Sequence, residues 1–188
     1  PTAQADPLQA DNPNLHGIHL VDYPGATQSA IAVVRRDAAF DSPTYFEDQL
    51  FNRVLGGAFV SRINMNLREE KGYTYGARTV FARRKKTGIF MAYASVKSDT
   101  TLLSLLEIKK ELAGITGDKP VTETEFLAAK NGLLLGLPGN YERMSKVASQ
   151  VHHVAAFNRQ ASWLANYPKS VRAVTIEKMS RRLSRWGI

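Results

Sequence analysis

The chain has 188 residues, no cysteine, and a formal net charge of +8 from 25 Lys and Arg against 17 Asp and Glu. This length fits one domain, and the lack of cysteine excludes disulfides, zinc ribbons and a cysteine nucleophile. No apolar run reaches the roughly 18 residues that a membrane span needs, and the first residues show no signal-peptide pattern. A basic chain can bind nucleic acid, an anionic membrane or an acidic substrate, and the charge does not choose among them.

The first segments predict an arm followed by a hairpin. Residues 1–16 are rich in Pro, Ala, Asp and Asn without any period, which predicts a linker or disordered arm ahead of one domain over residues 17–188. Residues 18–21 and 29–34 predict two strands, because both are short apolar runs. A turn over residues 23–26, with Pro and Gly in its central positions, would join them.

The middle of the chain predicts two helices and a second hairpin. The expected elements are helices over residues 42–55 and 60–70, and strands over residues 73–82 and 88–96. The double glycine Gly56–Gly57 is predicted to be a structural turn between the helices. The run Arg83–Lys86 is predicted to be the solvated tip of the hairpin.

The remainder predicts helices. One begins at Ser98–Asp99 and carries leucines at core-like spacing, and another opens with the capping box of Thr122 and Glu125. The leucines are Leu102, Leu105, Leu106 and Leu112, and two further helices are expected over residues 142–157 and from residue 175. Hairpins that do not alternate with helices predict an α+β fold, an antiparallel sheet packed against a layer of helices.

The histidines and carboxylates do not predict a catalytic centre. His16 and His19 have an odd separation on a predicted strand and point to opposite faces, while His152 and His153 are adjacent on a helix. Neither arrangement suits one metal ion. The zinc-peptidase motifs H-E-x-x-H and H-x-x-E-H do not occur, and no pair of carboxylates has acid–base spacing. We therefore predict no metal site in this chain.

Arg68 and Tyr75 are the strongest candidate site residues. Arg68 ends a predicted helix, Tyr75 enters a strand seven residues later, and a turn at Gly72 can bring both side chains to one edge. A guanidinium and a phenol there could grip a peptide carbonyl or carboxylate. The alternative is structural: Arg68 would stabilise a helix C-terminus, and Tyr73 and Tyr75 would fill a half-buried strand.

A resemblance to a known family rests on these same residues. The segment LGGAFVSRINMNLREEKGYTYGA (residues 55–77) resembles the C-terminal half of pitrilysin/insulinase-type zinc peptidases, a group that includes the mitochondrial processing peptidases and bacterial zinc proteases. The resemblance extends over residues 17–183, with HLVDYPGATQSAIAVV, TGIFMAYASVKSDTT and TETEFLAAKNGLL similar to the family's two hairpins and a later helix.

The resemblance implies two similar halves that close on a peptide. One half holds zinc through H-x-x-E-H, and the other contributes an Arg–Tyr pair, which Arg68 and Tyr75 match. Tyr75 would then stabilise the reacting carbonyl as the catalytic residue of this half, and both would bind substrate. This chain would be inactive alone, as a domain excised from a longer enzyme or a separate subunit, with zinc expected in its partner half.

Other interpretations stay open. A scaffold or interaction protein that has lost peptidase activity would keep the same fold, and the partner could be a second copy of the chain. A basic nucleic-acid-binding module is disfavoured because no recognised motif accompanies the charge. The resemblance to bacterial zinc proteases favours the periplasm or another extracytoplasmic location, although the lack of cysteine suits the cytosol equally.

Overall fold

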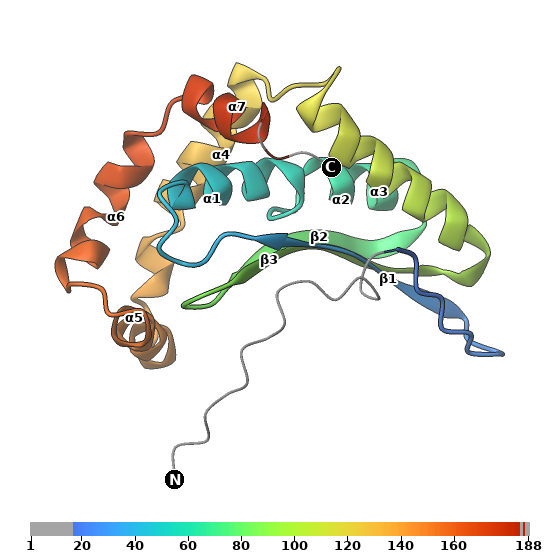
Figure 1. Cartoon of the computed structure of the whole chain (residues 1–188), viewed down its shortest axis with the longest axis horizontal. Coiled ribbons are helices and arrows are strands. Elements are labelled where there is room, and N and C mark those ends of the chain that lie inside the picture. Colours follow the sequence, from blue (N-terminus) through green and yellow to red (C-terminus); the bar gives the residue numbers. More distant parts are fainter. Residues whose placement is uncertain (1–16, 185, 187–188) are drawn as a thin grey trace, which may run out of the picture.

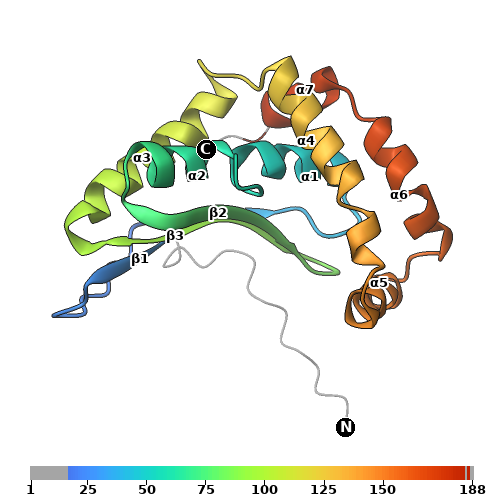
Figure 2. The same ribbon diagram turned by 180° about the vertical axis from the view of Figure 1, so that it is seen from behind.

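The computed structural model describes residues 17–184 and 186, so the predicted arm over residues 1–16 lies outside it. The fold is α+β, as predicted, with a three-stranded antiparallel sheet beneath a layer of helices (Figure 1, Figure 2). In chain order the elements are β1 (Gln28–Asp37), α1 (Tyr45–Leu55), α2 (Arg62–Asn64), the π-helical turn η2 (Met65–Glu70), β2 (Thr74–Arg83), β3 (Gly88–Lys97), η3 (Ser98–Thr100), α3 (Thr101–Thr116), α4 (Glu123–Leu135), η4 (Pro138–Asn140), α5 (Met144–Ala156), α6 (Ser162–Arg172) and α7 (Ile176–Ser184).

The strand order is β1-β3-β2, so β3 is central. β2 and β3 form the predicted second hairpin and pair Arg83 with Gly88, while β1 runs antiparallel along the other edge of β3 and pairs Gln28 with Lys97. Buried and less buried side chains alternate along β3, as expected for a sheet with one covered face. Helices α1, α2, α3, α4 and α7 lie over that face, and α5 and α6 stand at one end (Figure 1, Figure 2).

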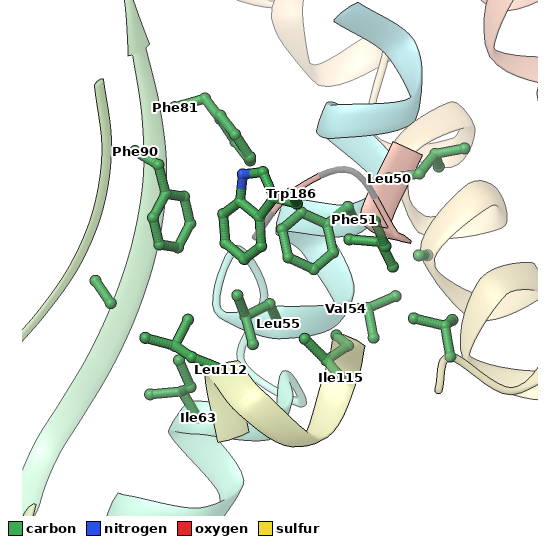
Figure 3. Close-up of a cluster of buried hydrophobic side chains, with 14 of the residues drawn as sticks. Leu50, Phe51, Val54, Leu55, Ile63, Phe81, Phe90, Leu112, Ile115 and Trp186 are labelled. Carbon is green, nitrogen blue, oxygen red and sulfur yellow. The ribbon is translucent and has the colours of Figure 1, made fainter. Parts of the chain in front are cut away.

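Trp186 lies in the middle of the core although it follows the last helix (Figure 3). Its ring is 1% exposed and meets Phe51 of α1 and Phe90 of β3 edge-to-face, with centroids 4.6 Å apart in each pair. Edge-to-face pairs of this kind add about 0.5–1.5 kcal/mol each beyond the burial of area. The ring therefore joins the helical layer, the sheet and the C-terminal segment.

The prediction of a solvated basic tip is wrong for Arg83. Its side chain is 3% exposed and forms an ion pair with Asp48 of α1, which is 1% exposed. The guanidinium also lies 5.2 Å from the ring centroids of both Tyr45 and Phe81. A buried charge needs such a partner, because an isolated one is very costly. The other three basic residues of the turn are exposed, as predicted.

The strand predicted over residues 18–21 does not form. Ile18, Leu20 and Val21 are exposed, and no ladder pairs them within the described part of the chain. Strand propensity depends on context, so a short apolar run does not by itself form a strand. The following turn does form: Ala26 N donates to Tyr23 O at 3.2 Å, and Gly25 has a φ of 82°, as a type II turn requires.

The helices follow the sequence with two exceptions. The capping box predicted at Thr122 and Glu125 is present. On α3, however, Leu102 and Leu106 are more than half exposed, so the leucines do not all belong to the core. The helix α6 was not predicted. It contains Pro168, which disfavours a helix interior, so tertiary packing overrides that local signal.

Candidate functional site

Arg68 lies in the last turn of η2, where the backbone widens from α-helical to π-helical geometry. Its neighbour Leu67 is fully buried, and the Asn66 amide donates to Glu107 and Glu111 of α3 at 2.9 and 2.8 Å. These contacts fasten one side of the turn to α3. A π-helical turn changes the direction of the side chains that follow it and is frequent at functional sites.

Tyr75 is presented by a β-bulge. The register between β2 and β3 shifts between Thr74 and Ala77, and the Thr74 hydroxyl bridges the irregularity by donating to Ser95 O at 2.5 Å and accepting from Gly76 N at 3.1 Å. A bulge breaks the simple alternation of side chains along a strand. Tyr75 is consequently 88% exposed at the start of β2.

Asn64 connects the helix to this bulge, and sequence reasoning missed it. Its side chain is buried, accepts a hydrogen bond from Ala77 N at 3.0 Å and donates to Phe59 O at 2.6 Å. Ala77 follows Tyr75 by two residues in β2, and Phe59 precedes the helical segment that leads to Arg68. The signal was an asparagine at an apolar position of the helix, which needs a polar partner once it is buried.

Arg68 and Tyr75 line one cleft of about 380 Å³ at the end of the sheet. Its wall also includes Tyr73, which packs against the core, and Lys97 at the end of the central strand. The remaining wall residues are Gln28, Glu69, Gly72 and Thr74. Lys97 was not predicted, because the pairing of Gln28 with Lys97 and of Thr74 with Val96 is needed to place it beside Tyr75.

The charge in this cleft is positive. Arg68 pairs with Glu69 at 3.1 Å and lies 4.6 Å from the Phe59 ring centroid, yet its side chain remains 40% exposed. Lys97 adds a second cation without a second carboxylate in the wall. Exposed ion pairs bind weakly, so the guanidinium can exchange Glu69 for a ligand oxygen at small cost. The arrangement suits a peptide carbonyl or carboxylate.

The sequence model of one family, described as the peptidase M16 inactive domain, matches residues 3–133. The chain belongs to this family. No curated protein sequence matches it. Within the M16 family, which holds the pitrilysin-like zinc peptidases, the inactive domain is the half without zinc ligands, so the resemblance of residues 55–77 is confirmed at the level of the family.

Solved structures share the fold of this M16 inactive domain. A peptidase M16 inactive domain from Pseudomonas fluorescens has a TM-score of 0.75 at 21% identity, over 85% of this chain and 38% of that chain. A protease from Helicobacter pylori has a TM-score of 0.77 at 18% identity, over 87% of this chain and 39% of that chain. The chain thus spans about two fifths of both relatives.

A third similar structure has nearly the same extent as this chain. It is the inactive peptidase domain of a protein named as a zinc protease from Bordetella parapertussis, with a TM-score of 0.70 at 17% identity, over 87% of this chain and 88% of that chain. At such identities the comparison shows the fold alone.

The described residues of this M16 domain do not fit a zinc ion. Among them, no three His, Cys, Asp or Glu side chains gather in a way that could hold a metal. His153 instead packs edge-on against Phe40, with centroids 4.5 Å apart, and burial lowers its pKa.

A helix long and apolar enough to cross a membrane is not found in the described part of the chain.

The double glycine before the cleft lets the end of α1 approach β2. A Cβ on Gly56 would lie 2.6 Å from Thr79 N, and the Gly56 carbonyl accepts a hydrogen bond from that same amide at 3.2 Å. A Cβ on Gly57 would lie 2.9 Å from Asn52 O. Any side chain at Gly56 would therefore push the helix away from the strand that carries Tyr75.

Proposed function

We propose that this chain is the substrate-holding, zinc-free part of a zinc metalloendopeptidase. In this proposal Arg68 anchors the backbone or a carboxylate of a bound peptide, and Tyr75 donates a hydrogen bond to the carbonyl oxygen as negative charge develops on it. The observation that carries the proposal is that Arg68 and Tyr75, from different elements, line one exposed cleft.

The chemistry of the two groups suits these roles. A guanidinium offers several N–H donors in a fixed plane, which match a carbonyl or a carboxylate. The Tyr75 hydroxyl is exposed, and no hydrogen bond to another described residue occupies it. A donor aimed at a developing oxyanion typically contributes about 10²–10³ in turnover. Lys97 at the same cleft adds positive charge that favours an electron-rich ligand.

The zinc belongs, in this proposal, to another half, in the same polypeptide or in a separate subunit. Two observations support this: the described residues hold no metal cluster, and the matching family is that of inactive domains. The similar domain from Bordetella parapertussis comes from a protein named as a zinc protease. Hydrolysis would be supplied by the zinc-bearing half, and this chain would orient the peptide.

A scaffold role is the second candidate. A chain of complex III2 from Candida albicans has the same fold, with a TM-score of 0.69 at 16% identity. This similarity supports the idea that such a domain can serve in a larger assembly. In that case Arg68 and Tyr75 would have only structural roles, and their replacement would leave every activity of the assembly unchanged.

The experiment is to purify the chain with its natural partner and to test the assembly for peptidase activity. We expect a partner that contains H-x-x-E-H, and a loss of about 10²–10³ in turnover for Tyr75→Phe. Arg68→Ala should chiefly raise KM, since Arg68 holds the ground-state peptide as well. Tyr93→Phe and Arg84→Ala, exposed positions outside the cleft wall, are the matched controls. Full activity in both cleft variants would exclude the proposed roles of Arg68 and Tyr75 and would favour the scaffold role.

A further inference from the structure

A second cavity, of about 690 Å³, lies among α1, α4, α5 and α6, away from the Arg68–Tyr75 cleft. Its volume falls within the range of about 300–1,000 Å³ that is usual for small-molecule sites. Its wall holds Tyr45, Trp163 and Tyr167, with ring centroids 5.8 Å apart between Tyr45 and Trp163 and 5.4 Å apart between Trp163 and Tyr167. Both pairs are edge-to-face, so the cavity has an aromatic side.

Arg53 gives this cavity a positive charge, and it is the only Lys or Arg among the described residues that line the wall. Within residues 17–184 and 186, no Asp or Glu lines the cavity, and no carboxylate lies within ion-pair distance of Arg53. A partly buried cation without a counter-ion attracts an anion more strongly than an exposed one does, because the surroundings screen it less.

Gly132 of α4 makes room for this guanidinium. A Cβ at Gly132 would lie 2.6 Å from Arg53 Nη2 and 2.8 Å from Nε. A basic residue in the last turn of α1 is favourable to the helix dipole, but that effect alone does not require a glycine on the facing helix. Arg53 is therefore packed against α4 at the wall of the cavity.

The other polar groups of the wall are neutral donors and acceptors. Burial raises the pKa of both Tyr45 and Tyr167, so their hydroxyls stay protonated at neutral pH. Burial, together with nearby Arg159, lowers the pKa of His153, which favours the neutral imidazole. Asn140 adds an amide. The cavity thus combines aromatic rings, one cation and several neutral hydrogen-bonding groups.

We propose that this cavity binds a small aromatic carboxylate, with its ring against Tyr45, Trp163 and Tyr167 and its carboxylate on Arg53. The ligand is either a free aromatic acid or the C-terminal residue of a peptide, since both present a ring and a carboxylate at similar separation. The site is independent of the Arg68–Tyr75 cleft and stands whether or not the chain serves a peptidase.

Binding can be followed with the two tryptophans of the chain. Trp163 lies in the cavity wall and Trp186 lies in the core. In proton–nitrogen NMR spectra of the full chain, 3-phenylpropanoate should move the Trp163 indole signal and leave that of Trp186 in place. An acid of this size should bind with a Kd of about 1 mM. The neutral analogue 3-phenylpropan-1-ol should bind about tenfold more weakly, because it lacks the charge that Arg53 recognises.

Variants extend the test. Arg53→Met keeps the apolar stem and should weaken binding of the acid at least about tenfold, while leaving the alcohol unchanged. Arg84→Met, on the exposed hairpin turn, is the matched control and should change neither. N-acetylglycylphenylalanine distinguishes a peptide C-terminus from a free aromatic acid as the ligand. If it binds more tightly than 3-phenylpropanoate, the ligand is a peptide C-terminus. If it binds more weakly, the ligand is a free acid.

Two results would overturn the proposal. One is a Trp163 signal that does not move with 3-phenylpropanoate at about 10 mM, well above the expected Kd. The other is equal affinity for the acid and the alcohol. Both use the unaltered chain, so they remain decisive even if a variant at Arg53 fails to fold.

Discussion

Asp48 of α1 and Arg182 of α7 lie 134 residues apart in the chain and form an ion pair at 2.8 Å. Arg182 also pairs with Asp37 at the end of β1 at 3.2 Å, and the Trp186 indole donates to Asp37 at 3.1 Å. Burial raises the pKa of the Asp48 carboxyl, and the guanidinium groups of Arg182 and Arg83 oppose that shift. The network attaches the last helix to the first strand and the first helix.

Replacing Asp48 should therefore be among the most costly single changes in the chain. Asp48→Asn leaves the buried Arg83 and the largely buried Arg182 without their shared carboxylate. This loss costs about 3–5 kcal/mol in the free energy of unfolding. Urea unfolding followed by circular dichroism measures this loss. Asp41→Asn, at an exposed position of the turn before α1, should stay within about 0.5 kcal/mol of the original chain. Equal stability of the two variants would contradict the network's role.

Gly56→Ala should destabilise the chain by about 1–3 kcal/mol, because the added methyl group would overlap the backbone of Thr79. Thermal unfolding of the variant measures this change. Gly139→Ala is the control, since the nearest atoms to a Cβ there are 3.9 Å away on the side chain of Glu142. A Gly56→Ala variant as stable as Gly139→Ala would show that the turn can relax without cost.

Glu125 should contribute stability that depends on pH. The two guanidinium hydrogen bonds from Arg62, at 2.6 Å each, are the main reason why the pKa of Glu125 is lowered to about 2, and Thr122 adds to the effect. The folded pKa lies below the unfolded value of about 4.3. The contribution is therefore fully present above that pH and is lost as the pH falls from about 4.3 towards 2.

The measurement compares Glu125→Gln with the original chain in urea at a series of pH values. Because the Glu125 side chain is 31% exposed, solvent screens the pair and the expected difference at neutral pH is about 1 kcal/mol. That difference should shrink as the pH falls below about 4.3. Glu123→Gln, in the same helical turn but without an arginine partner in the described part of the chain, should show no such trend. A difference that stayed constant down to low pH would show that it does not come from the ionised form of Glu125.

Asn64→Ala should loosen the bulge that presents Tyr75. The variant leaves Ala77 N and Phe59 O without their partner, which costs about 1–3 kcal/mol where such groups are buried. Hydrogen exchange at the Ala77 amide should accelerate, and this readout distinguishes a local opening from a general loss of stability. Asn131→Ala, at an exposed position of α4, should leave the exchange at Ala77 unchanged.

Features that depend only on neighbouring residues could be predicted from the amino-acid sequence. The hairpin of β2 and β3, the capping box at Thr122 and the type II turn at Gly25 each arise from local hydrogen bonds and allowed backbone angles. The α+β class could also be predicted, because the expected strands do not alternate with helices. The family could be predicted because residues 55–77 carry a specific pattern. The position of Arg68 and Tyr75 at one edge could be predicted because only the turn at Gly72 separates their elements.

The packing of whole elements determines which side chains are buried and which distant segments meet. Arg83 is in the interior because Asp48 and two rings surround it, whereas Leu102 is exposed because nothing among the described residues covers that side of α3. Trp186 fills the core, and Lys97 reaches the cleft, through contacts between segments far apart in the chain. Burial and long-range pairing depend on how whole elements pack, and a local residue pattern does not contain that information.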